Sequence, residues 1–146
     1  MLCNLLKIFC LFAIFGCSKN YQSDSIRYEL NQEEFMQLCY QEEVGPIELL
    51  NYLKRYDGQN IGVEVDQLPK KWIGKKDIRS LIKYIDSQEP AAEAINVYES
   101  RGLRPDKSTV GNEALKLIEG YIDGVYLRIG KERSKEEIID WWEAHK

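Results

Sequence analysis

Apolar residues recur at intervals of three and four along much of this chain, the spacing that gathers them on one face of an α-helix. The clearest example is the segment 75–87, in which the apolar positions follow the order i, i+3, i+4, i+7: Ile78, Leu81, Ile82 and Ile85. Similar patterns predict five further helices. They open at or just after Asn31, Gly45, Glu89, Thr109 and Ser134.

Residues typical of helix ends support these boundaries. Asn31 with Glu34, and Ser134 with Glu137, have the spacing of capping boxes, in which each side chain binds the backbone N–H of the other residue. Gly124 is the expected C-cap of the fifth helix, because glycine accepts the left-handed conformation that ends many helices.

The fifth helix, 110–123, bears apolar residues over more than one stripe, which favours a central position with neighbours on two sides. Glu113 and Glu119 flank that apolar surface, and we expect both at its solvent edge. Cys39 lies at helical spacing beside Leu38, and we expect a small core residue there rather than a reactive thiol.

The segment 59–73 does not follow the helical pattern. Residues 61–65 alternate like a short strand, yet no second strand is evident to pair with them. We therefore expect an ordered connection that buries Ile61, Val63 or Leu68. The predicted fold class is all-α, with about six short helices packed as antiparallel hairpins, in either a HEAT-like array or a compact orthogonal bundle.

The first residues have the anatomy of a secretory signal, with one cation, Lys7, before an apolar run that ends at Phe15. The run is too short to cross a bilayer, which takes about 20 apolar residues. With Gly16 and Cys17 after it, the segment 11–17 resembles the lipobox of a bacterial lipoprotein precursor. The resemblance implies cleavage before Cys17 and a lipid on its thiol that anchors the protein to a membrane.

This reading divides the chain into a signal peptide (1–16), a polar, flexible tether (17–30) and a single helical domain (31–146). Ser18, rather than Asp, follows the cysteine, which resembles lipoproteins of the outer membrane. In its Ser108-to-Tyr121 stretch and its Trp-Trp ending, the mature part resembles small uncharacterised helical lipoproteins of gut anaerobes. That resemblance implies no activity.

Processing changes the charge and the thiol content. Loss of Lys7 leaves 19 of the 20 cationic side chains against 24 anionic ones, a balance of −5 that gives no electrostatic support for a nucleic-acid partner. Cys3 and Cys10 leave with the leader and Cys17 is lipidated. Cys39 is then the one remaining thiol, and we expect no intrachain disulfide.

The residues that most often carry catalysis are scarce. The one histidine, His145, is next to the last residue, and no Cys/His cluster of the kind that holds zinc is present, so we expect no metal and no cofactor. Paired carboxylates such as Glu136 and Glu137 fall in first turns of helices, where the helix dipole favours anions. A hydrolase that places two carboxylates across a cleft stays as the alternative.

The segment from Pro69 to Lys76 concentrates positive charge around a tryptophan. Cations in the first turn of a helix oppose its dipole, so helix stability does not account for them. One interpretation is an anion-binding surface for phosphorylated lipid headgroups, a cell-wall polymer or an acidic partner. In the other, the tryptophan packs on the core and the lysines form a solvated rim. The candidate binding residues are Lys71, Trp72, Lys75, Lys76 and Arg79.

The leading hypothesis is therefore an envelope protein held to the outer membrane through Cys17, acting without catalysis by binding a protein or a cell-surface polymer. The alternative is a carboxylate-dependent hydrolase of envelope glycan or peptide. A pocket lined by two inward carboxylates, one with a raised pKa, would favour the hydrolase.

Overall fold

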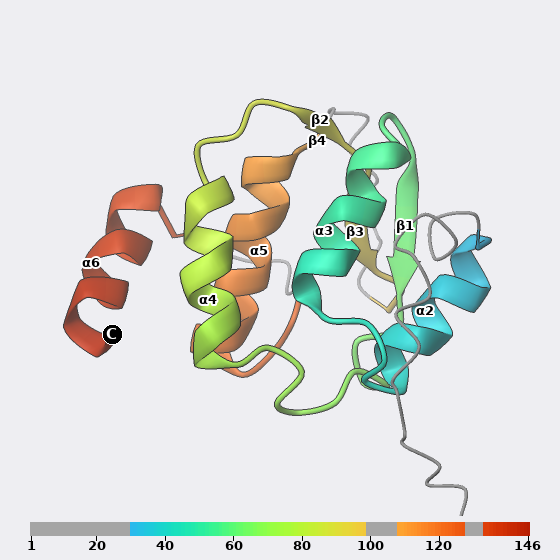
Figure 1. The fold of residues 1–146 in the computed structure, drawn as a ribbon, viewed down its shortest axis with the longest axis horizontal. Coiled ribbons are helices and arrows are strands. Elements are labelled where there is room, and N and C mark those ends of the chain that lie inside the picture. The colour runs from blue at the N-terminus through green and yellow to red at the C-terminus, as the bar shows by residue number, and fades with distance from the viewer. Residues whose placement is uncertain (1–29, 99–107, 128–132) are drawn as a thin grey trace, which may run out of the picture.

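The computed structural model describes residues 30–98, 108–127 and 133–146. The expected signal peptide, Cys17 and all but the last residue of the tether lie outside these ranges. The described elements, in chain order, are α2 (Gln32–Tyr40), α3 (Pro46–Arg55), β1 (Asn60–Val63), α4 (Lys75–Leu81), the 3₁₀ turn η1 (Ile82–Tyr84), β2 (Pro90–Ala91), β3 (Glu93–Asn96), β4 (Ser108–Thr109), α5 (Val110–Asp123) and α6 (Lys135–His145) (Figure 1).

The all-α prediction is wrong, because the described part also contains two small sheets. β1 pairs in parallel with β3, in a register that joins Asn60 to Glu93 and Val63 to Asn96. β2 pairs antiparallel with β4. β1 lies in the segment 59–73, which the sequence analysis interpreted as a connection because no partner strand was evident. Its partner, β3, lies in a segment that the sequence analysis had placed in a helix. The fold is mixed α and β, neither a HEAT-like array nor a helical bundle.

The prediction of a helix that opens at Glu89 is wrong, and the burial pattern shows the physical reason. Ala92, Ala94 and Asn96 are buried, and the residues between them are half-buried, which is the two-residue period of a strand. Alanine is the best helix former, so the alanine-rich composition favoured a helix. Pairing with β1 overrides that local preference.

Four helices were predicted well from local signals. α2, α3, α5 and α6 cover the expected segments, and the capping boxes at Asn31 and Ser134 are both present. Gly124 ends α5 with φ 71°, in the left-handed region. The helix expected over 75–87 is shorter, since α4 ends at Leu81 and passes into η1.

Two side chains of α2 cover the outer edge of β1. The Gln59 carbonyl accepts the Glu93 N–H of β3, and the Val63 carbonyl accepts the Val97 N–H just after β3. Alternate residues of a strand point their polar groups to opposite edges, so those of Gly62 and Glu64 face the other edge of β1. There Gln32 donates to the Gly62 carbonyl at 3.4 Å, and the Tyr40 hydroxyl accepts the Glu64 N–H at 2.9 Å. Two strands alone are marginally stable, so these helix side chains complete the sheet.

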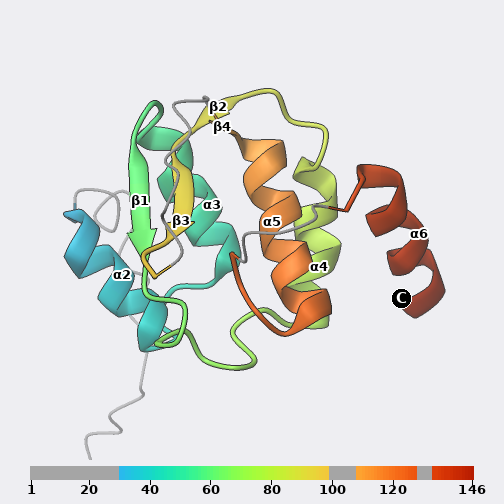
Figure 2. The ribbon, with the colours of Figure 1, turned by 180° about the vertical axis from the view of Figure 1, so that it is seen from behind.

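α5 is central, as the sequence predicted. It contacts α3, α4, η1 and α6 as well as the short strands β2 and β4. In Figures 1 and 2, α3 lies between the parallel strand pair and the α4–α5 pair, and α6 lies beyond α4 at the far end. The inward side of α5 contributes fully buried residues to the core: Ala114, Leu117 and Ile118.

Two glycines let neighbouring backbone approach α5 closely. A Cβ at Gly111 would lie 2.7 Å from the Ser87 carbonyl oxygen and 2.8 Å from that of Ile85. A Cβ at Gly120 would lie 2.9 Å from the Cα of Tyr126. Both positions therefore require glycine for space, although each lies inside a helix where glycine is otherwise unfavourable.

Replacement of Gly111 by alanine should lower the free energy of unfolding by about 1–3 kcal/mol, because the added methyl meets backbone that has little room to move. On an exposed helix the same change stabilises by about 1 kcal/mol, so the sign of the effect tests the close approach. Urea unfolding of the full chain, followed by circular dichroism, measures it. Asn112→Ala, at the neighbouring exposed position, is the control and should change stability by about 0.5 kcal/mol or less. A more stable Gly111→Ala variant would contradict the packing.

Candidate functional site

The cations singled out in the sequence lie on one segment that runs from the turn before α4 to the end of η1. Six of its side chains are exposed: Lys70, Lys71, Lys75, Lys76, Arg79 and Lys83. We call these six the basic surface. α4 buries Ile78 and Leu81 against the core, so its exposed cations face outward. α4 lies in front of α5 in Figure 1 and behind it in Figure 2, which places the basic surface on the outer side of the helical pair.

Trp72 fixes this segment to the core. Its side chain is 6% exposed, its indole N–H donates to the Val44 carbonyl at 2.8 Å, and its ring meets Tyr126 edge-on at 6.0 Å between centroids. The Tyr126 hydroxyl in turn accepts the Ile73 N–H at 3.2 Å. A tryptophan this deeply buried offers no open face for stacking on a sugar ring. Trp72, one of the candidate binding residues, is therefore part of the core and positions the neighbouring lysines.

A hollow of about 470 Å³ opens beside Trp72, between the first turns of α3 and α4. Lys71 and Lys76 lie on its wall, and so do three carboxylates: Glu42, Glu48 and Asp77. Two of these cap the helices, because Glu48 accepts the Gly45 N–H at 3.2 Å and Asp77 accepts the Gly74 N–H at 2.8 Å. The hollow has mixed charge, and the positive character belongs to the convex surface beside it.

The cations of the basic surface differ from the other cations of the described ranges in their ion pairing. Every lysine or arginine outside it interacts with another group: Lys54, Arg55, Lys116, Arg133, Lys135 and Lys146. Within residues 30–98, 108–127 and 133–146, no side chain of the basic surface makes a salt bridge or hydrogen bond. Within the described ranges, none of its six positive charges is therefore held in an ion pair.

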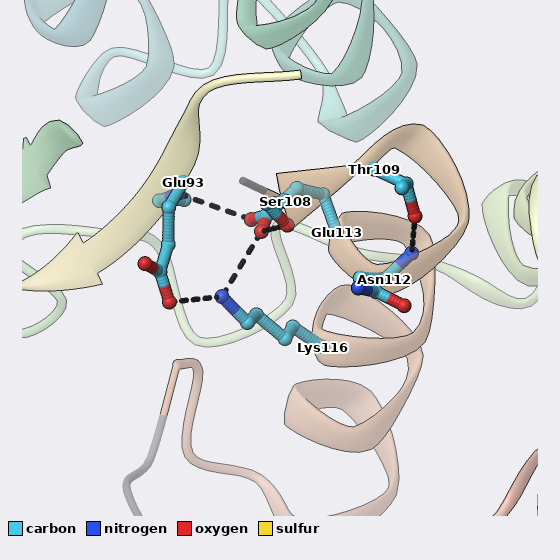
Figure 3. A network of polar contacts seen from close by, with 7 residues as sticks. Glu93, Ser108, Thr109, Asn112, Glu113 and Lys116 are labelled. Carbon is cyan, nitrogen blue, oxygen red and sulfur yellow. Dashed lines mark hydrogen bonds and ion pairs between the residues drawn. The ribbon is translucent and has the colours of Figure 1, made fainter. Parts of the chain in front are cut away.

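A second polar cluster, which the sequence analysis misjudged, surrounds Glu113 (Figure 3). We expected Glu113 at the solvent edge, but it is 1% exposed. Its carboxylate accepts the Ala94 N–H at 3.1 Å, the Ser108 hydroxyl at 2.5 Å and the Lys116 ammonium at 3.0 Å. Lys116 also lies 3.0 Å from Glu93. Ala94 and Ser108 belong to β3 and β4, which the sequence analysis did not predict, so no local pattern indicated a buried acid.

Both charged partners of this cluster have shifted pKa values. Burial raises the pKa of Glu113, and the charge of Lys116 together with the hydrogen bonds from Ser108, Lys116 and Ala94 limits the rise. Burial acts to lower the pKa of Lys116, but Glu113 and Glu93 outweigh it and raise that pKa. Both carboxylate oxygens of Glu113 are engaged by the chain itself, which indicates a structural role.

Of the two features that would favour the hydrolase, carboxylates do line the hollow beside Trp72, but the described acid with the raised pKa does not. The acid with the raised pKa, Glu113, lines neither the hollow beside Trp72 nor a second hollow of about 350 Å³ between α2 and β1. Glu119, also expected at the solvent edge, is half-buried and accepts the Arg133 N–H. In the described part of the chain, no group of three or more His, Cys, Asp or Glu side chains has the arrangement of a metal site.

Among the helices of the described ranges, none has both the length and the apolarity needed to cross a membrane. Comparison of the chain with known protein families, with curated protein sequences and with solved structures found no match.

Removal of the Glu113 carboxylate should destabilise the fold. Glu113→Ala leaves a buried amide, a hydroxyl and an ammonium without their acceptor, and should cost about 3 kcal/mol of unfolding free energy. Glu113→Gln keeps one carbonyl acceptor and should cost about half as much. Urea unfolding of the full chain measures both. Glu136→Ala, on the exposed first turn of α6, should change stability by about 1 kcal/mol at most. Equal losses at positions 113 and 136 would contradict the role of the cluster.

The raised pKa of Glu113 also predicts a dependence on pH. The folded state holds this proton more tightly than the unfolded chain, so protonation adds stability below the ordinary pKa of 4.5, and that stability is lost as pH rises through the folded pKa. Glu113→Gln lacks the titration. The native chain should have a higher free energy of unfolding than Glu113→Gln, and this difference should become smaller as pH rises from about 4 to about 7. A widening margin would show that Lys116 and the hydrogen bonds outweigh burial.

Proposed function

We propose that this protein is a lipoprotein of the bacterial cell envelope, held to the outer membrane by lipid on Cys17, and that its domain binds an anionic partner through the basic surface. It acts by binding and not by catalysis. The observation that supports the proposal is the contrast in pairing: the six exposed cations from Lys70 to Lys83 have no partner in the described ranges, whereas every other described lysine and arginine has one.

The placement of these cations has no structural explanation. Lys75 and Lys76 occupy the first turn of α4, where the helix dipole disfavours positive charge. Like charges that share a surface also repel one another, by about 1 kcal/mol for a pair 4 Å apart in water. An anionic partner relieves both costs, which is the physical reason for assigning the surface to binding.

The side chains also indicate what kind of anion is recognised. Five of the six cations are lysines, which act as mobile point charges, whereas paired recognition of a single phosphate or carboxylate favours the planar guanidinium of arginine. Trp72 is buried and provides no stacking face. The basic surface therefore suits a ligand with many negative charges, recognised by charge density more than by the shape of one group.

Binding of the full-length protein in non-ionic detergent to fluorescein-labelled poly-L-glutamate, followed by fluorescence anisotropy, tests the proposal. Neutralising four of the exposed cations should weaken binding by about tenfold or more, because each contact contributes to the electrostatic attraction. The substitutions are Lys71→Gln, Lys75→Gln, Lys76→Gln and Arg79→Gln.

The matched control removes the same amount of charge from cations that have partners, with Lys54→Gln, Arg133→Gln, Lys135→Gln and Lys146→Gln. It should retain affinity within about threefold of the native protein, and binding to the native protein should weaken as salt rises. Equal weakening by the two sets would mean that net charge alone governs binding, and the proposal would be wrong. Absence of any binding at low salt would have the same meaning.

A further inference from the structure

With Cys17 lipidated as proposed, the basic surface is tethered to the membrane that the lipid enters. We propose that the anion it binds is acidic phospholipid of that same membrane, so that the domain rests with the outer face of α4 against the bilayer. This inference rests on the proposed anchoring at Cys17 and on the proposed anion binding, and it names the partner.

The cations are arranged in a way that suits contact with a flat surface more than binding of a ligand in a pocket. Lys75, Arg79 and Lys83 follow one another at intervals of four residues along α4 and η1, and Lys70 and Lys71 extend the surface past the start of the helix. From residue 75 to residue 83 a helix advances roughly 12 Å, at about 1.5 Å per residue. A row of exposed cations of this length, on an outward helix face, can contact several lipid headgroups at once.

The same surface lacks the side chains that insert into a bilayer. The large apolar residues that are exposed in the described ranges are Val97, Tyr98 and Val125, and none of them belongs to the segment 70–83. Membrane-inserting helices place residues such as Trp, Phe or Leu on the lipid-facing side. Contact through the basic surface is therefore electrostatic, made at the level of the headgroups, and sensitive to salt.

The tether supplies the proximity that such a contact needs. Residues 18–30 span at most about 45 Å when extended, at roughly 3.5 Å per residue. Short flexible linkers give effective concentrations in the millimolar range, so a surface too weak to bind free vesicles firmly still docks when it is tethered to one.

Lysine footprinting on vesicles tests this inference. The full-length protein is purified from bacterial membranes, the lipid on Cys17 is checked by intact mass, and the protein is reconstituted into vesicles of phosphatidylcholine, with or without phosphatidylglycerol. Acetylation of each lysine is then followed by mass spectrometry. The basic-surface lysines should react about threefold or more slowly on the acidic vesicles, and high salt should abolish this protection. Lys54 is paired with Glu89 and lies at the end of α3 that is far from the hollow. It should react at the same rate on both kinds of vesicle.

The two sets of substitutions make the test specific. In the protein with Lys71, Lys75, Lys76 and Arg79 changed to glutamine, Lys70 and Lys83 should lose their protection on acidic vesicles. In the matched control, with four partnered cations changed, both should keep it. Loss of protection in both proteins would overturn the inference, because it would trace the effect to net charge.

The outcomes also separate this inference from the function on which it rests. Protection by soluble poly-L-glutamate but not by acidic vesicles would overturn membrane docking and leave anion binding in place, with a polymer or an acidic protein as the partner. Protection by neither would overturn both proposals. An unmodified Cys17 in the intact mass would overturn the anchoring premise and the inference with it.

Discussion

The carboxylate of Glu113 joins elements that would otherwise have little to hold them together. Through its three hydrogen bonds it ties the backbone of β3, a side chain of β4 and Lys116 of α5 to one point inside the protein. Burying a charge is unfavourable unless it is paired and hydrogen-bonded, and here both conditions are met. The two small sheets and the central helix therefore share one polar centre, and the apolar core closes around it.

The parallel pair β1–β3 depends on this arrangement. Parallel strands are normally buried on both faces within larger sheets, because helices cover them. Here two strands suffice because neighbouring side chains satisfy the backbone groups at their edges: Gln32 and Tyr40 on one side, Glu113 on the other. The helices thus supply the hydrogen bonds that further strands provide in a larger sheet.

The sequence predicted the features that local chemistry determines. The capping boxes at Asn31 and Ser134 and the left-handed Gly124 define the ends of α2, α5 and α6 within a residue or two. It did not predict β3, because alanine-rich composition favours a helix and the strand partner lies about thirty residues away in the chain. The burial of Glu113 was missed as a consequence, since its partners come from the misassigned segments.

For the candidate site, the residues were evident from the sequence but their arrangement was not. A count of lysines identifies a basic segment, yet it does not show that, within the described ranges, the other cations have partners and these have none. Nor does it show that Trp72 turns inward and leaves the surface to charge alone. Both findings depend on contacts between residues far apart in the chain, which no local pattern encodes.

The pairing of β1 with a single neighbour has a dynamic consequence. In the described ranges neither strand pairs with a second strand, and the β3 edge is closed by Glu113, in the first turn of α5. Separation of β1 from β3 therefore exposes the amide groups of both strands together, and a further displacement of β3 from α5 takes the Ala94 N–H away from its acceptor, Glu113. The strand pair and the start of α5 form one cooperative unit of local opening, so slow hydrogen exchange in one is coupled to slow exchange in the other.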